Sequence, residues 1–301
     1  MASPRSAEQR FLDPAVLARI ASLELKARTI VEGFLSGLHR SPLKGFSVEF
    51  AAYRQYLPGD DLSTIDWKVF ARSDRHYVRK YEEETNLRAY LLLDISASMG
   101  FGSGPMTKVE YGSCLAGCLA YLMKSQRDSA GLMTFDNRIR TLLPPASRPG
   151  HLRALLLALD RQEIGETSDM AQPLHQLADA IDKRSLVVLI SDLLDDPSGV
   201  IDGLKHLRFR GNDVLVFQVL DRAELTFPFE GPATFEDVET GERVVTAPSA
   251  VRAQYLAALE AHVERYRREL RSAGIDYERL DTSEPMDFAL LSFLSVRSRR
   301  Q

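Results

Sequence analysis

Two short runs of apolar residues constrain the fold of this chain more than any other feature. Residues 89–93 read Ala-Tyr-Leu-Leu-Leu, and residues 186–190 read Leu-Val-Val-Leu-Ile. A strand with one solvent-exposed face alternates apolar and polar residues, whereas a strand covered on both faces is continuously apolar. The runs therefore predict two buried strands of a parallel sheet that has helices on both faces, with residues 89–93 near its centre.

Helical and strand patterns alternate around both runs. Further helices are expected at 107–126, 151–160, 170–182, 197–208, 248–272 and 286–296, and further strands at 130–135, 138–143, 214–220 and 275–280. The strands at 130–135 and 138–143 meet at Asp136-Asn137, which predicts a tight hairpin turn. Because strands separated by helices build doubly wound sheets with right-handed crossovers, the predicted fold class is α/β with a doubly wound, mainly parallel sheet.

The two ends of the chain depart from this alternation. Residues 12–37 have helical periodicity, and residues 45–57 and 76–82 read as extended. Since no flexible linker follows them, residues 1–85 are expected to be an N-terminal extension packed on the core. Residues 86–301 then form the α/β domain. It carries an insertion at about 222–274, with short strands at 225–246 and the long charged helix at 248–272.

Composition narrows the classes of function. The 301 residues are 45% hydrophobic and 27% charged, with a net charge of −4, so the chain is globular and has no bulk basic field for nucleic acid. No apolar run approaches the ~20 residues of a membrane helix, and no signal-peptide pattern is visible. Cys114 and Cys118 stand four residues apart within a helix, unlike a secreted disulfide framework. These features predict a cytoplasmic protein with no membrane span.

Small polar residues follow the buried strands. Asp94-x-Ser96-x-Ser98 ends the first strand, Asp192 follows the second, and Thr167 precedes a helix. Such residues often only cap the next helix. However, ligands of α/β sheets collect at the carboxyl ends of the strands, and Mg²⁺ prefers six oxygen ligands at ~2.0–2.1 Å. We expect the three hydroxyl groups to ligate Mg²⁺ or another divalent cation, with both carboxylates holding it directly or through water.

This pattern resembles the metal-ion-dependent adhesion site of von Willebrand factor A-like domains. The resemblance implies a site that accepts a carboxylate from another protein as the last ligand of the ion. The family often has two glycines before the threonine, whereas here Gly165 is followed by Glu166. That difference places an acidic side chain beside the expected site, where it can alter ion preference or block an incoming carboxylate.

A second signature, R-x-Y-x-P-G-D-D, lies ahead of the core. It consists of Arg54, Tyr56, Pro58, Gly59, Asp60 and Asp61, followed by Ile65, Asp66, Trp67 and Lys68 and then by Ala71 and Arg72. It resembles the signature of domain of unknown function 58, and the resemblance spans roughly residues 30 to 220. Members of that family are discussed as partners of MoxR-type AAA+ ATPases. The resemblance implies an adaptor or partner of such an ATPase or of its client, and the signature itself is either scaffold or partner surface.

Two classes of function remain open on the sequence. The first is a non-enzymatic, metal-dependent protein-binding module, since no P-loop, zinc-enzyme spacing or nucleophile elbow is found. The second is a Mg²⁺-dependent phosphatase similar to haloacid dehalogenases, with Asp94 as nucleophile. That chemistry normally uses an aspartate two residues later as general acid, and the chain has Ser96 there. The binding module is therefore preferred.

Overall fold

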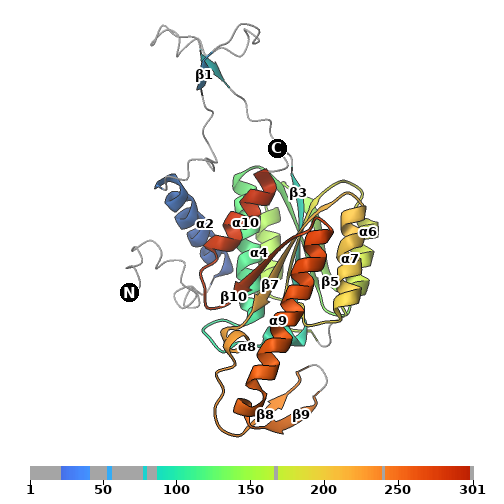
Figure 1. The fold of residues 1–301 in the computed structure, drawn as a ribbon. Coiled ribbons are helices and arrows are strands. Elements are labelled where there is room, and N and C mark those ends of the chain that lie inside the picture. The colour runs from blue at the N-terminus through green and yellow to red at the C-terminus, as the bar shows by residue number, and fades with distance from the viewer. Residues whose placement is uncertain are drawn as a thin grey trace.

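The computed structural model describes residues 22–40, 53–55, 77–79, 87–165, 169–238 and 241–298. Its centre is a six-stranded sheet with the order β10-β7-β6-β3-β4-β5 (Figure 1). The strands are β3 (Arg88–Asp94), β4 (Ser129–Phe135), β5 (Ile139–Ala146), β6 (Leu186–Ser191), β7 (Asp213–Leu220) and β10 (Asp276–Asp281). All neighbours pair in parallel except β4 and β5, which form the predicted antiparallel hairpin. The predicted α/β class with a mainly parallel sheet is confirmed, and β3 lies inside the sheet.

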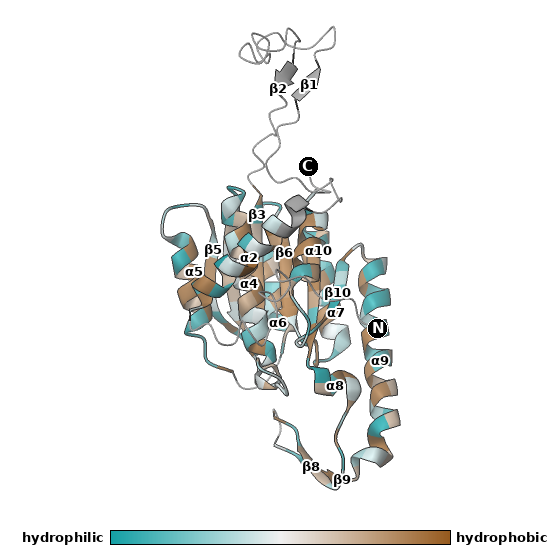
Figure 2. Cartoon of the chain, turned by 90° about the vertical axis from the view of Figure 1, so that its left-hand side faces the viewer, coloured by the Kyte–Doolittle hydropathy of each residue, from teal (hydrophilic) through white to brown (hydrophobic). Residues whose placement is uncertain are grey.

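Helices cover both faces of the sheet. One layer consists of α2 (Leu23–Arg40), α4 (Lys108–Ser125), α5 (His151–Asp160) and α10 (Asp287–Ser298), and the other of α6 (Ala171–Ala180), α7 (Pro197–Phe209) and α9 (Pro248–Ser272). Successive side chains of a strand point to opposite faces. Leu91 and Leu93 of β3 accordingly belong to the core under α4, while Tyr90 and Leu92 belong to the core under α6 and α7. Figure 2 shows hydrophobic residues along the strands and on the helix sides that face them.

Helix α4 lies directly on the sheet because its contact face is made of small residues. A Cβ atom on Gly112 would come within 2.8 Å of the Leu93 side chain and 3.1 Å of the Ile190 side chain, so a larger residue would have to push these side chains aside. Cys114 and Cys118 are buried free thiols on the same helix. Burial raises the pKa of Cys118, so it acts as a small apolar side chain.

The segment between β7 and α9 forms an arm beyond the sheet (Figure 1). The structure corrects one expectation here: Leu225 lies in a short helix, α8 (Arg222–Thr226), not in a strand. Asp221 and Glu224 form a capping box at its start, which is the local sequence signal for this helix. The hairpin of β8 (Ala233–Glu236) and β9 (Arg243–Thr246) follows, and it lies beside the first turns of α9, below the sheet in Figure 1.

The two edges of the sheet differ in chemistry. Strand β5 carries Pro144 and Pro145, which have no backbone N–H to donate. Strand β10 reads Asp-Tyr-Glu-Arg-Leu-Asp and is mostly charged. Both edges therefore carry residues that oppose pairing with a further strand.

Part of the N-terminal region is described. Leu23, Ala27 and Ile30 of α2 are buried in the core that α4 shares, and β1 (Tyr53–Gln55) pairs with β2 (Tyr77–Arg79). The expected helix before residue 22 and almost all of the R-x-Y-x-P-G-D-D signature lie outside the described residues. Among the helices that the structure describes, none has the length and apolarity needed to cross a bilayer.

Candidate functional site

The candidate site lies where the chain reverses the direction in which it adds strands to the sheet. From β3 the chain passes through α4 to β4 on one side, while β6 pairs with β3 on the other side. This is a topological switch point, and the carboxyl ends of β3 and β6 meet there. Asp94 is the last residue of β3, Ser191 is the last residue of β6, and Asp192 follows it.

The Asp94 carboxylate is buried and fixed through both oxygens. The backbone N–H of Ser96 donates to Oδ1 at 2.9 Å, and the Ser191 hydroxyl donates to Oδ2 at 2.7 Å. The register explains the second bond. Leu93 pairs with Ile190, so the next residues of the two strands, Asp94 and Ser191, lie side by side.

Asp94 has an unusual electrostatic environment. Burial and, to a smaller extent, the charge of Asp192 raise the pKa of Asp94 to about 7, against the opposing effect of its hydrogen bonds. Within the described residues no lysine, arginine or histidine forms an ion pair with it. A carboxylate of this kind is stabilised in its charged form by a nearby cation.

The two serines of the Asp94-x-Ser96-x-Ser98 loop place their hydroxyls together. Their Oγ atoms are 3.2 Å apart, with Ser96 buried and Ser98 half-buried in the turn η3 (Ala97–Gly100). Two ligands at right angles on an ion with ~2.1 Å bonds are about 3 Å apart. The distance between the two hydroxyls therefore fits neighbouring positions of an octahedral shell.

Asp192 serves the opposite face of the sheet. The alternation of side chains turns Ser191 toward Asp94 and Asp192 toward α4. There the Lys108 ammonium donates to Asp192 Oδ2 at 2.8 Å and to Glu224 Oε1 at 2.7 Å. Asp192 Oδ1 accepts the N–H of Leu194 at 3.1 Å. Lys108 is fully buried, so this is an interior ion cluster.

The opposite charges of Lys108, Asp192 and Glu224 stabilise one another's ionised forms. Burial lowers the pKa of Lys108, but Asp192 and Glu224 more than offset that effect, and the pKa is raised overall. Burial raises the pKa of Glu224, and Lys108 opposes that rise. The ammonium therefore stays protonated at neutral pH.

The turn after Asp192 is held in a strained conformation. Leu193 has φ 58°, in the left-handed region, which costs a branched residue about 1 kcal/mol. Its N–H donates to the Ser191 hydroxyl at 2.9 Å, and its carbonyl lies 2.9 Å from His262 Nε2 of α9. These contacts fix the direction in which Asp192 leaves the strand.

Thr167 and Glu166 lie outside the described residues. The described residue before them, Gly165, donates its N–H to the carbonyl of Ile95 at 2.7 Å. A Cβ atom there would collide with the Asp136 carboxylate, so glycine is required for this approach. The chain thus reaches the Asp94–Ser96 loop at Gly165, and Thr167 remains a predicted ligand.

Sequence reasoning missed Lys108 and Ser191. Each left a signal. A lysine in the first turn of a helix faces the positive end of the helix dipole, so a compensating anion is expected there. Ser191 and Asp192 stand at the end of a buried strand and point to opposite faces of the sheet. Both side chains are therefore expected to need hydrogen-bond partners.

A second polar cluster surrounds Asp221 at the end of β7. Asp221 accepts the N–H groups of Ser103 at 3.0 Å and Ala223 at 2.8 Å, as well as the hydroxyls of Ser103 and Thr282. It therefore ties the loop between η3 and α4, which contains Ser103, to the start of α8.

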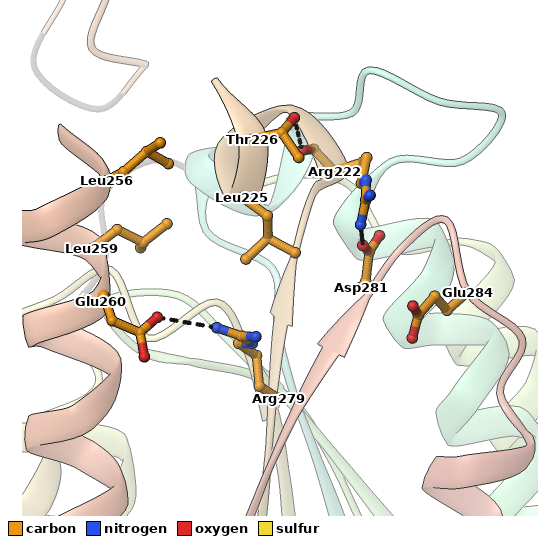
Figure 3. Close-up of a pocket in the computed structure, with 9 residues that line it drawn as sticks. All are labelled: Arg222, Leu225, Thr226, Leu256, Leu259, Glu260, Arg279, Asp281 and Glu284. Atoms are coloured by element: carbon orange, nitrogen blue, oxygen red, sulfur yellow. Dashed lines mark hydrogen bonds and ion pairs between the residues drawn. The ribbon is translucent and has the colours of Figure 1, made fainter. Parts of the chain in front are cut away.

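A cavity of about 520 Å³ lies between α8, α9 and β10 (Figure 3). Leu225, Leu256 and Leu259 line it, together with the ion pairs Arg222–Asp281 at 2.9 Å and Arg279–Glu260 at 3.4 Å. No residue of the Asp94–Ser98 loop lines this cavity, so the cavity and the candidate site are separate.

The chain is similar in sequence to one protein family and in fold to several solved structures. A family model described as "Protein of unknown function DUF58" matches residues 52–265. The uncharacterized protein Rv1480 of Mycobacterium tuberculosis is 27% identical over 293 residues, covering 95% of this chain and 91% of the relative. An aerotolerance-related membrane protein from Bacteroides fragilis has a TM-score of 0.48 at 20% identity and covers 70% of this chain and 99% of its own. The SpRpn10 VWA domain has a TM-score of 0.36 at 14% identity, covering 70% and 95%.

Proposed function

Because the chain belongs to the DUF58 family, as its R-x-Y-x-P-G-D-D signature predicts, we propose that it is a non-enzymatic, metal-dependent protein-binding module. Ser96, Ser98 and Thr167 ligate Mg²⁺ or a similar divalent cation, and Asp94 and Asp192 hold it, partly through water. The ion supplies a Lewis-acidic position to which a carboxylate of a partner protein binds. The partner is a MoxR-type AAA+ ATPase or its client, which places the chain in the cytoplasm.

One observation carries this proposal. Two hydroxyls 3.2 Å apart lie in the turn that directly follows a buried carboxylate, and this carboxylate has neutral hydrogen-bond donors and no ion-pair partner among the described residues. If Asp94 only capped the turn that follows β3, the hydrogen bond from the backbone N–H of Ser96 would be enough. The pair of neighbouring hydroxyls on Ser96 and Ser98 is not needed for that role. A divalent cation bound by the hydroxyls would neutralise the remaining charge.

The burial of Asp94 argues against the phosphatase alternative. A nucleophilic carboxylate needs one oxygen free to attack phosphorus from an exposed direction. Both oxygens of Asp94 accept hydrogen bonds, and its exposed fraction is 0%. A search for an aspartyl-phosphate on Asp94 after incubation with acyl phosphate and Mg²⁺ is expected to find none.

Paired thermal melts and partner capture test the proposal. With Mg²⁺ the wild type should melt at a higher temperature than in chelator, because the ion binds the folded state. Asp94→Ala should lose this shift and the Mg²⁺-dependent capture of the ATPase or its client from lysate. Asp202→Ala, an exposed position on α7, serves as the matched control and should behave as wild type. Retention of both effects by Asp94→Ala would show that the loop is only cap chemistry.

A further inference from the structure

Lys108 is the least expected charge in the molecule. It is fully buried, it begins α4 at the positive end of the helix dipole, and it contacts two carboxylates. An ammonium group loses several kcal/mol of hydration when it is buried, and the attraction of its partners repays this only with good geometry. Its distances of 2.8 Å to Asp192 and 2.7 Å to Glu224 provide that geometry.

The contact with Asp192 bears directly on the proposed cation site. Asp94 meets only neutral donors, whereas Asp192 Oδ2 already holds a full positive charge at 2.8 Å. A divalent cation that draws on both carboxylates has to share Asp192 with the ammonium or displace it. Two like charges near one carboxylate repel each other strongly in a medium of low dielectric constant.

We propose that Lys108 is a built-in competitor of the divalent cation for Asp192, and that it lowers the affinity of the site for that ion. This inference rests on the proposed function and adds a residue that sets the strength of cation binding. The ammonium keeps a partner when it leaves Asp192, because Glu224 Oε1 lies 2.7 Å away. Glu224 is itself held through Oε2 by the N–H of Asp221 at 2.7 Å, so this second position is prepared.

The test measures the Kd of Mn²⁺, a spectroscopically visible substitute for Mg²⁺, by titration calorimetry and electron paramagnetic resonance. Lys108→Gln removes the positive charge and keeps a hydrogen-bond donor, and it should bind Mn²⁺ at least about tenfold more tightly than wild type. Lys108→Arg keeps the positive charge, so the repulsion of the divalent cation remains and the Kd should stay within about threefold of wild type. Lys124→Met removes an exposed lysine from the same helix and should change nothing.

Two further variants test whether the result depends on the folding of Lys108→Gln and where the ion binds. If Lys108→Gln does not fold, Lys108→Met combined with Glu224→Gln removes the ammonium and one of its carboxylates together, and it should show the same tightening. Adding Ser96→Ala and Ser98→Ala to Lys108→Gln should abolish the tight binding, which locates the ion at the two hydroxyls.

The outcomes separate this inference from the proposed function. Equal or weaker Mn²⁺ binding by Lys108→Gln would overturn competition while leaving a cation site in place. An equal gain in Lys108→Arg would also overturn it, because the charge would then be irrelevant. No binding by wild type and by every Lys108 variant would overturn both proposals.

Discussion

Asp94 and Asp192 stand at the same edge of the same sheet, yet the fold gives them opposite surroundings. Asp94 turns toward α6 and meets a serine hydroxyl and a backbone N–H, while Asp192 turns toward α4 and meets an ammonium. The alternation of side chains along β3 and β6 decides this assignment. Asp94 is therefore left to be neutralised by a proton or an external cation, whereas Asp192 is neutralised by Lys108 of the same chain.

The largest expected effect comes from removing the internal cation. Lys108→Met leaves Asp192 and Glu224 buried without their ammonium, and breaking a buried ion pair typically costs 3–5 kcal/mol. We expect a loss of about 3–5 kcal/mol in the free energy of unfolding, measured by urea denaturation in chelator. Lys124→Met should lose less than about 0.5 kcal/mol. A Lys108→Met protein as stable as wild type would show that Asp192 needs no charge partner.

The second-largest effect is a pH dependence of stability that comes from Asp94. The folded protein holds the Asp94 proton with a pKa of about 7, well above that of an unfolded aspartate. Between these values the folded state binds more protons than the unfolded state, so stability falls as pH rises from about 4 to 7, by at most about 1.4 kcal/mol per pH unit.

Asp94→Asn should remove this slope, because its amide keeps the acceptor for the N–H of Ser96 and does not titrate. The measurement is a series of urea denaturation curves in chelator from pH 4.5 to 8 for both proteins. Asp202→Asn, an exposed change, should keep the slope of the wild type. Parallel curves for wild type and Asp94→Asn would mean that Asp94 is not the titrating group.

A smaller effect is expected from the neutral partner of Asp94. Ser191→Ala removes the donor to Oδ2 and the acceptor for the N–H of Leu193, leaving two buried polar atoms unpaired. The expected loss is about 1–3 kcal/mol. It should be larger at pH 8 than at pH 5, since a charged acceptor suffers more from the loss of a donor. Ser272→Ala, an exposed serine that bonds only within its own helix, is the control.

The smallest effect concerns the start of α4, which carries Lys108. Thr107 accepts the N–H of Glu110 at 3.3 Å, and the Glu110 side chain accepts the N–H of Thr107 at 2.8 Å. Thr107→Ala should destabilise the protein by about 1 kcal/mol, as measured by thermal denaturation. Thr226→Ala, an exposed threonine that bonds a carbonyl of its own helix, should cost less. A loss of more than about 3 kcal/mol would indicate that the cap also holds Lys108 in place.

Much of the fold followed from local pattern. The apolar runs at 89–93 and 186–190 predicted β3 and β6, and the helix expected at 248–272 has the same bounds as α9. Helix α8 was missed because its five residues are too short for periodicity, and only the capping pair Asp221 and Glu224 announces it.

The candidate site was predictable only in part. Asp94, Ser96 and Ser98 lie close together because they share one turn, and local sequence determines such a turn. The partners of Asp192 depend on which helix covers each face of the sheet at β6. Lys108 and Asp192 are 84 residues apart in sequence, so only the tertiary packing brings them together. A single sequence contains no record of such a distant pairing. Thr167 therefore stays a prediction, together with the metal itself.

The chemistry of the sheet edges has a consequence for how the protein meets other molecules. Peptides that bind by strand addition need a row of free backbone donors and acceptors, and Pro144 and Pro145 interrupt that row on β5. On β10, a second copy placed in register would bring like charges together along much of the strand. Edge-to-edge association through β5, or through a parallel pair of β10 strands, is thereby discouraged. If the proposed function is correct, a partner is therefore expected at the loops at the carboxyl end of the sheet, where affinity would depend on a few side chains and not on a row of backbone hydrogen bonds.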